Sequence, residues 1–146
     1  MHIVLLACLI ELIHSKNYKV TIESSNTNIL NFLKEKLKIY DFFKQGQEYI
    51  ESTDTCVFNL WKVEDSKALD YARRVTNYFN NNFFKGRDTS ALKNALDELY
   101  GNIADHSKCS GNAFSYIFYD ENSKKIYVAI CDFGLGVAST DRKSVV

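Results

Sequence analysis

The stretch KIYVAICDFGLG, residues 125–136, contains an apolar strand that ends at a carboxylate and is followed by two glycines. A carboxylate at the end of a strand, here Asp132, can accept a hydrogen bond from an exocyclic amine. Gly134 and Gly136 have no Cβ, so their backbone can approach a flat ring or a phosphate closely. Because Asp and Gly are also ordinary turn residues, an unspecialised turn is the alternative interpretation of this stretch taken alone.

A polar stripe follows the apolar face of a helix that we predict from Ala91, capped by Ser90, to about Ser107. The residues predicted to share the apolar face are Leu92, Ala95, Leu96, Leu99 and Ile103. Glu98, Asn102 and Asp105 fall together beside that face. A carboxylate and a carboxamide four residues apart can share a hydrated Mg²⁺ that carries phosphates, because Mg²⁺ takes few protein oxygens. The alternative is a solvated helix face.

The helix, two predicted strands and the Asp-x-Gly-x-Gly turn follow one another in a fixed order. The segment ELYGNIADHS, residues 98–107, resembles the N-box of the GHKL superfamily, and DFGLG, residues 132–136, resembles its G1 box. This superfamily of ATP-binding folds includes histidine kinases, anti-sigma serine kinases and gyrase-type ATPases. The resemblance covers residues 64–137 and implies that ATP and Mg²⁺ are the ligands.

The resemblance also implies a role for each residue of the two boxes. Asn102 would hold Mg²⁺ against the phosphates, with Asp105 among the nucleotide-binding residues of the same helix. Asp132 would bond the adenine amine, and Gly134 and Gly136 would line the nucleotide. The family therefore predicts a site assembled from one helix and one strand end.

The function implied by the resemblance is that of an ATP-binding regulatory domain of the histidine-kinase or anti-sigma serine-kinase type. Glu98 would be the general base, so an active protein would be an ATP-dependent protein kinase or ATPase. The chain stops at Val146, before a second glycine box or an ATP lid, and we therefore expect a truncated domain that lacks phosphate contacts. The alternative is a non-catalytic protein-interaction module, or an inactive fragment that retains the fold.

The fold class that we predict is α/β. Residues 64–146 are expected to form an incomplete two-layer α/β sandwich, with helices over a mixed or antiparallel sheet. Residues 1–63 are expected to form a small α/β region that loosely resembles STAS-like modules. Hydrophobic periodicity predicts helices at 3–14, 28–37, 68–79 and 91–107, and strands at 18–22, 49–51, 56–63, 114–119 and 125–132. A turn at 120–123 would join the last two strands in a hairpin.

Composition bears on location and partners. Lys and Arg number 18 and Asp and Glu also number 18, so the chain has no net charge to attract nucleic acid or an anionic membrane. The apolar run at 3–13 is shorter than the roughly 20 residues of a membrane-spanning helix. The four cysteines are scattered, which favours reduced thiols and a cytoplasmic protein. We expect a regulatory protein partner, and neither nucleic acid nor membrane.

The motifs of other enzyme classes are missing from the sequence. DFG also occurs in eukaryote-type protein kinases, but their glycine-rich loop and H-R-D loop have no counterpart here. A G-x-S-x-G nucleophile motif is not present either. His106 and Cys109 form an H-x-x-C pair without the second pair that structural zinc requires. The GHKL resemblance therefore has no enzymatic competitor of similar detail.

Overall fold

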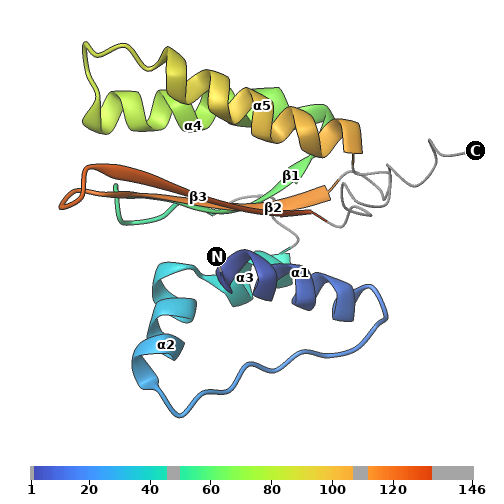
Figure 1. Cartoon of the computed structure of the whole chain (residues 1–146). Helices are drawn as coiled ribbons and strands as arrows, with labels where there is room; N and C mark the ends of the chain where they lie inside the picture. The colour runs from blue at the N-terminus through green and yellow to red at the C-terminus, as the bar shows by residue number, and fades with distance from the viewer. Residues whose placement is uncertain (1, 46–49, 107–111, 133–146) are drawn as a thin grey trace, which may run out of the picture. The chain divides into compact units, whose positions relative to one another are not determined.

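The computed structural model describes residues 2–45, 50–106 and 112–132, and it is an α/β structure (Figure 1). The helices are α1 His2–His14, α2 Thr27–Asn31, α3 Ile39–Gln45, α4 Ala68–Phe83 and α5 Ser90–His106, with a π-helical segment η1 at Phe32–Lys36 and a 3₁₀ turn η2 at Asp65–Lys67. The strands are β1 Val57–Glu64, β2 Asn112–Asp120 and β3 Lys125–Asp132. The coarse prediction of an α/β chain is confirmed.

The three strands form one antiparallel sheet in the order β1-β2-β3, so β2 is the central strand. Its middle residues are buried whichever way they point: Phe114, Ser115 and Ile117 are each 0% exposed. The β2–β3 hairpin turns at Asp120, whose carboxylate accepts bonds from the Asn122 backbone N–H (2.9 Å) and the Ser123 hydroxyl (2.7 Å). Such a turn is what Asp and Asn favour locally, and the predicted hairpin is confirmed.

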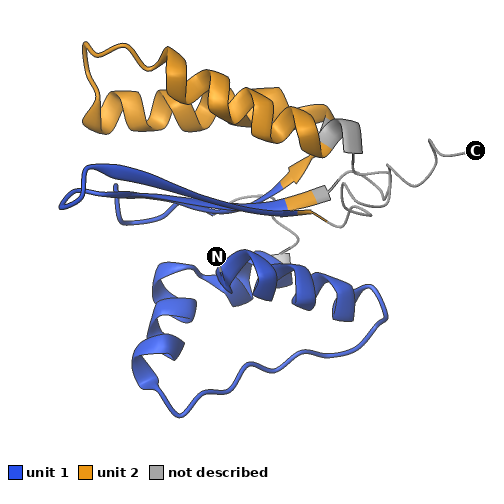
Figure 2. Cartoon of the chain, in the orientation of Figure 1, with its two compact units in different colours: residues 1–62, 114–131 blue, residues 63–113, 132–146 orange. Residues whose placement is uncertain are grey.

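Contacts divide the chain into two compact units, which Figure 2 shows in different colours. Unit 1 comprises residues 1–62 and 114–131, and unit 2 comprises residues 63–113 and 132–146. The hairpin strands therefore group with the N-terminal helices through residue 131, and Asp132 groups with α4 and α5.

In unit 1, α1 and α3 lie on one side of the sheet (Figure 1). The Cys8 thiol of α1 donates to the Cys131 carbonyl of β3 at 3.6 Å. Phe42 and Phe43 of α3 pack against Phe114 of β2, with ring centroids 6.1 and 6.0 Å apart. These aromatic contacts join α3 to the centre of the sheet.

In unit 2, α4 and α5 pack against each other as an antiparallel pair (Figure 1). The buried positions of α4 recur every three or four residues, as in an amphipathic helix: Ala68, Tyr71, Ala72, Val75, Thr76 and Phe79. Tyr71 meets Tyr100 of α5 edge to face, with centroids 4.8 Å apart and planes at 84°. Gly86, at a φ of +74°, supplies the left-handed turn between the helices.

Two predicted strands are wrong. Residues 18–22 are extended but join no ladder, and Tyr18 is 67% exposed. Ile50 and Glu51 also lie outside any strand, while Tyr49 is outside the described residues. A β-prone sequence becomes a strand only where another strand offers it a hydrogen-bonding edge, and the three-stranded sheet is built from other segments.

Three details of the helices also differ from prediction. The helix α3 was not predicted, and the predicted helix 28–37 widens into a π-helix at η1. Ser90 is not the cap of α5: its N–H donates to Asp88 Oδ1 at 2.8 Å, and the first helical bond runs from the Lys93 N–H to the Thr89 carbonyl. The helix therefore begins at Ser90, with Asp88 and Thr89 satisfying its first turn.

Candidate functional site

The buried face of α5 differs from the predicted one. Tyr100 is 0% exposed and lies beside buried Leu96 and Ile103, whereas Ala95 and Leu99 are exposed. The aromatic ring fills the contact with Tyr71 on α4, which an alanine at the edge of the face could not do. The apolar face is therefore rotated toward Tyr100.

This rotation changes the position of the polar stripe. On a helical wheel, Asn102 lies about 130° and Glu98 about 170° from the middle of the Leu96–Tyr100–Ile103 face. Both side chains are exposed, on the far side of the helix from its packed face and not at its lip. A carboxylate and a carboxamide one turn apart are thus accessible to a ligand in solution.

The other predicted site residues are located to different extents. Asp132 is the last described residue of β3 and is exposed. Asp105 lies on the last turn of α5, but its side chain is not among those described. Gly134 and Gly136 lie outside the described residues.

The described part of the site is therefore carried by unit 2. The helix α5 brings Glu98 and Asn102 together by its geometry alone, since residues four apart are neighbours on a helix surface. Asp132 belongs to the same compact unit, although most of β3 belongs to the other. That Asp132 and Asn102 bind the same ligand remains a prediction.

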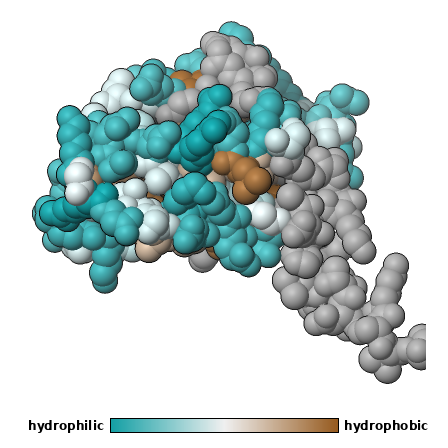
Figure 3. All heavy atoms as spheres, turned by 90° about the horizontal axis from the view of Figure 1, so that it is seen from above, coloured by the Kyte–Doolittle hydropathy of each residue, from teal (hydrophilic) through white to brown (hydrophobic). Residues whose placement is uncertain are grey.

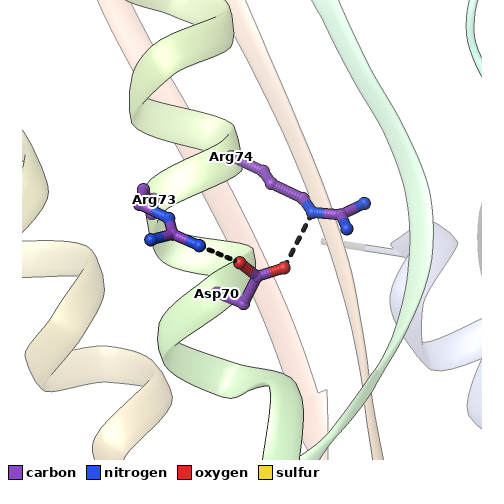
Figure 4. Close-up of polar contacts among 3 residues, drawn as sticks. All are labelled: Asp70, Arg73 and Arg74. Atoms are coloured by element: carbon purple, nitrogen blue, oxygen red, sulfur yellow. Dashed lines mark hydrogen bonds and ion pairs between the residues drawn. The ribbon is translucent and has the colours of Figure 1, made fainter.

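The pair α4–α5 also carries a charged groove that the sequence reading missed. The groove has a volume of about 350 Å³ and is lined by Leu69, Asp70, Arg73, Lys93 and Asp97. Asp70 binds Arg73 at 2.5 Å and Arg74 at 2.8 Å (Figure 4), and Lys93 binds Asp97 at 2.5 Å. The spacings of three and four residues are a signal of such pairs in the sequence.

Charge in this groove is balanced, which affects its chemistry. The Arg73 hydrogen bond, followed by the charge of Arg74, holds the pKa of the Asp70 carboxyl below its ordinary value. Basic and acidic groups that already pair with each other have little surplus charge to offer a phosphate. The face of the molecule drawn in Figure 3 is mostly hydrophilic, with small hydrophobic areas. The groove is a solvated helix face with salt bridges.

The described residues contain no preformed cluster of metal ligands. Across 2–45, 50–106 and 112–132, no three His, Cys, Asp or Glu side chains are grouped to hold a metal ion. Mg²⁺ does not require such a cluster, because it often binds with phosphate and water and takes only one or two protein oxygens. The exposed carboxamide of Asn102 could supply one of them.

Comparisons with known proteins identify no relative: no family model matches the chain, and no curated protein or solved structure matches it significantly. Within the described ranges, no helix combines the length and apolar composition needed to cross a bilayer.

Proposed function

We propose that residues 64–146 form an ATP-binding regulatory domain of the histidine-kinase or anti-sigma serine-kinase type, a member of the GHKL superfamily with an incomplete α/β sandwich. One observation carries the proposal: α5, with exposed Glu98 and Asn102, is followed by a hairpin whose second strand ends at exposed Asp132. This is the element order that the N-box and G1 box require. A cytoplasmic location and a regulatory protein partner belong to the same proposal.

Each residue has a distinct role in this proposal. The Asn102 carboxamide oxygen binds the Mg²⁺ that accompanies the phosphates, and Asp105 lies one turn further along α5. Asp132 accepts a hydrogen bond from the adenine amine. Gly134 and Gly136 let the backbone approach the nucleotide, because neither carries a Cβ.

The adenine contact is the first step to test. Calorimetric titration of ATP and of ADP, with Mg²⁺ present, should give one site on the wild-type chain. Asp132→Asn replaces an acceptor oxygen by an amide and should weaken binding at least tenfold, since a hydrogen bond to a charged group contributes about 1.5–3 kcal/mol. Asp41→Asn, which changes an exposed carboxylate of α3, is the matched control and should bind as the wild type does.

Two results would contradict the nucleotide site. One is a wild-type chain that binds neither nucleotide. The other is an Asp132→Asn variant with unchanged affinity, because the adenine would then be held elsewhere. Either result moves the interaction-module alternative ahead.

Glu98 separates an enzyme from a binding module. As a general base it would contribute about 10²- to 10⁴-fold to phosphoryl transfer, so Glu98→Gln should lose that factor in ATP turnover while ATP still binds. Glu35→Gln, at an exposed position of η1, is the control. Turnover by Glu98→Gln equal to that of the wild type would show that this residue is not the base. A wild-type chain that binds ATP without turnover would be a nucleotide-dependent interaction module.

A further inference from the structure

A pocket in unit 1, separate from the residues proposed to bind nucleotide, has the dimensions of a small-molecule site. It lies between α1, the extended segment after it and α3, and its volume is about 370 Å³. Pockets of about 300 to 1,000 Å³ are typical of ligand sites. Its apolar and aromatic lining comes from Ile10, Val20, Ile22, Ile39, Tyr40 and Phe43.

The extended segment is held in place by specific bonds. Asn17, at a φ of +62°, lies in the turn that follows α1, and its N–H donates to the His14 carbonyl at 2.8 Å. The Tyr40 hydroxyl of α3 then donates to the Ile22 carbonyl at 3.1 Å. These contacts explain why residues 18–22 are extended without joining the sheet: they form a wall of the pocket.

The two lysines that line the pocket are both positively charged. Lys19 and Lys44 line it and are exposed, and His14 stands beside them with its ring edge to face against Phe43 at 5.7 Å. None of the described lining residues is acidic. An apolar cavity with ammonium groups at its edge is complementary to a molecule with an apolar body and a single negative charge.

We propose that this pocket binds a small amphipathic carboxylate of the medium-chain fatty-acid class, with the chain among the apolar residues and the carboxylate at Lys19 and Lys44. A straight chain suits a cavity between two helices and an extended segment, because it needs no polar partner inside. The charged end stays where lysine side chains reach water, so neither ion is fully desolvated. This function is independent of the nucleotide site.

The probe is decanoate, titrated calorimetrically into the full chain below its micellar concentration, with octanoate, decanol and decylammonium as comparisons. Decanoate should bind at one site and about tenfold more tightly than octanoate, since each buried methylene contributes up to about fourfold in affinity. Decanol should bind more weakly than decanoate, and decylammonium should show no binding.

Two sets of variants locate the ligand. The double variant Lys19→Gln/Lys44→Gln should bind decanoate about tenfold more weakly, from about threefold for each partly exposed charge. Lys34→Gln/Lys125→Gln removes the same charge at exposed positions outside the lining and should bind normally. Val20→Phe should fill the pocket and abolish binding, while Val20→Ala should keep it.

Several outcomes would overturn the proposal. Decanoate that does not bind would show that the pocket is not a fatty-acid site. Decylammonium that binds as tightly as decanoate would show that the lysines do not select a negatively charged ligand. Equal affinity of the two lysine double variants would place the carboxylate elsewhere. Should Val20→Phe fail to fold, the lysine variants and the chain-length comparison decide the question by themselves. ATP titration of the same variants should be unchanged, which keeps this test distinct from that of the nucleotide site.

Discussion

The α4–α5 pair and the helix α1 differ in how they divide polar from apolar residues. On α4, buried Tyr71, Val75 and Phe79 form one face, and half-buried Asp70 pairs with two exposed arginines outside it. On α1 the buried residues are apolar, but three exposed ones are apolar too: Leu5, Leu9 and Leu12 are 49%, 53% and 48% exposed. The periodicity of α4 identifies its buried face from the sequence, whereas the apolar residues of α1 lie on more than one side of the helix and do not identify one.

The largest expected effect breaks the α4–α5 contact. Tyr71→Ala removes a 1% exposed ring that meets Tyr100, and it should lower the free energy of unfolding by about 3–5 kcal/mol, as for other large aromatic truncations. Tyr18→Ala, at an exposed position beside the unit 1 pocket, should change it by less than about 0.5 kcal/mol. Urea unfolding followed by circular dichroism measures both. Similar losses of unfolding free energy in the two variants would show that α4 and α5 do not form a packed core.

A smaller effect concerns the sheet of unit 1 at high pH. Burial, with the charge of Asp54, raises the pKa of Tyr116 to about 12 from 10.0. A raised pKa favours the protonated phenol in the folded state, so this stability is present below pH 10 and is lost as the pH rises toward 12. Between pH 9 and 11, the free energy of unfolding of Tyr116→Phe should therefore fall by about 1–2 kcal/mol less than that of the wild type.

Thermal unfolding between pH 9 and 11 tests this expectation. The midpoint of the wild-type chain should fall more steeply across that range than that of Tyr116→Phe. Tyr127→Phe, at a half-exposed position of β3, is the control and should follow the wild type. Parallel curves for wild type and Tyr116→Phe would contradict the burial of this phenol.

The smallest effect concerns the exposed charges of α4. The pKa of Asp70 is lowered by Arg73 and Arg74, so the stability that it contributes is present above its unfolded pKa and is lost as the pH falls through the folded one. Because the Asp70 side chain is 38% exposed and its arginine partners are more exposed still, Asp70→Asn should reduce the unfolding midpoint only slightly, and less at high salt. A large, salt-independent loss would mean that this cluster has a structural role that its exposure does not suggest.

The sequence predicted well those elements whose pattern is strong over a long window. α4, α5, β1 and the β2–β3 hairpin lie close to their predicted positions, because alternation, helical periodicity and an Asp-Glu-Asn-Ser turn are local signals. The short helix α3 and the π-helical η1 were not predicted, since segments of five to seven residues carry too little periodicity.

The candidate site was predictable in its residue types and spacing. Glu98 and Asn102 are four positions apart on one predicted helix, and Asp132 follows an apolar strand, and both features are readable from the sequence. The face on which the first two lie was not predictable. Ala95 and Leu99 fit the wheel as well as Tyr100 does, and only the contact between Tyr71 and Tyr100 favours one of these faces.

By itself, the sequence determined which segments are helices and strands where periodicity is strong, and which polar residues recur at helix and strand ends. The tertiary structure decided that residues 18–22 form a pocket wall rather than a strand, that Leu5, Leu9 and Leu12 are the exposed side of α1, and that Tyr100 completes the buried face of α5. The physical reason is that hydrogen-bonding edges and packing partners are supplied by parts of the chain that are distant in sequence. A local pattern does not specify which distant segment a strand will pair with or a helix will pack against.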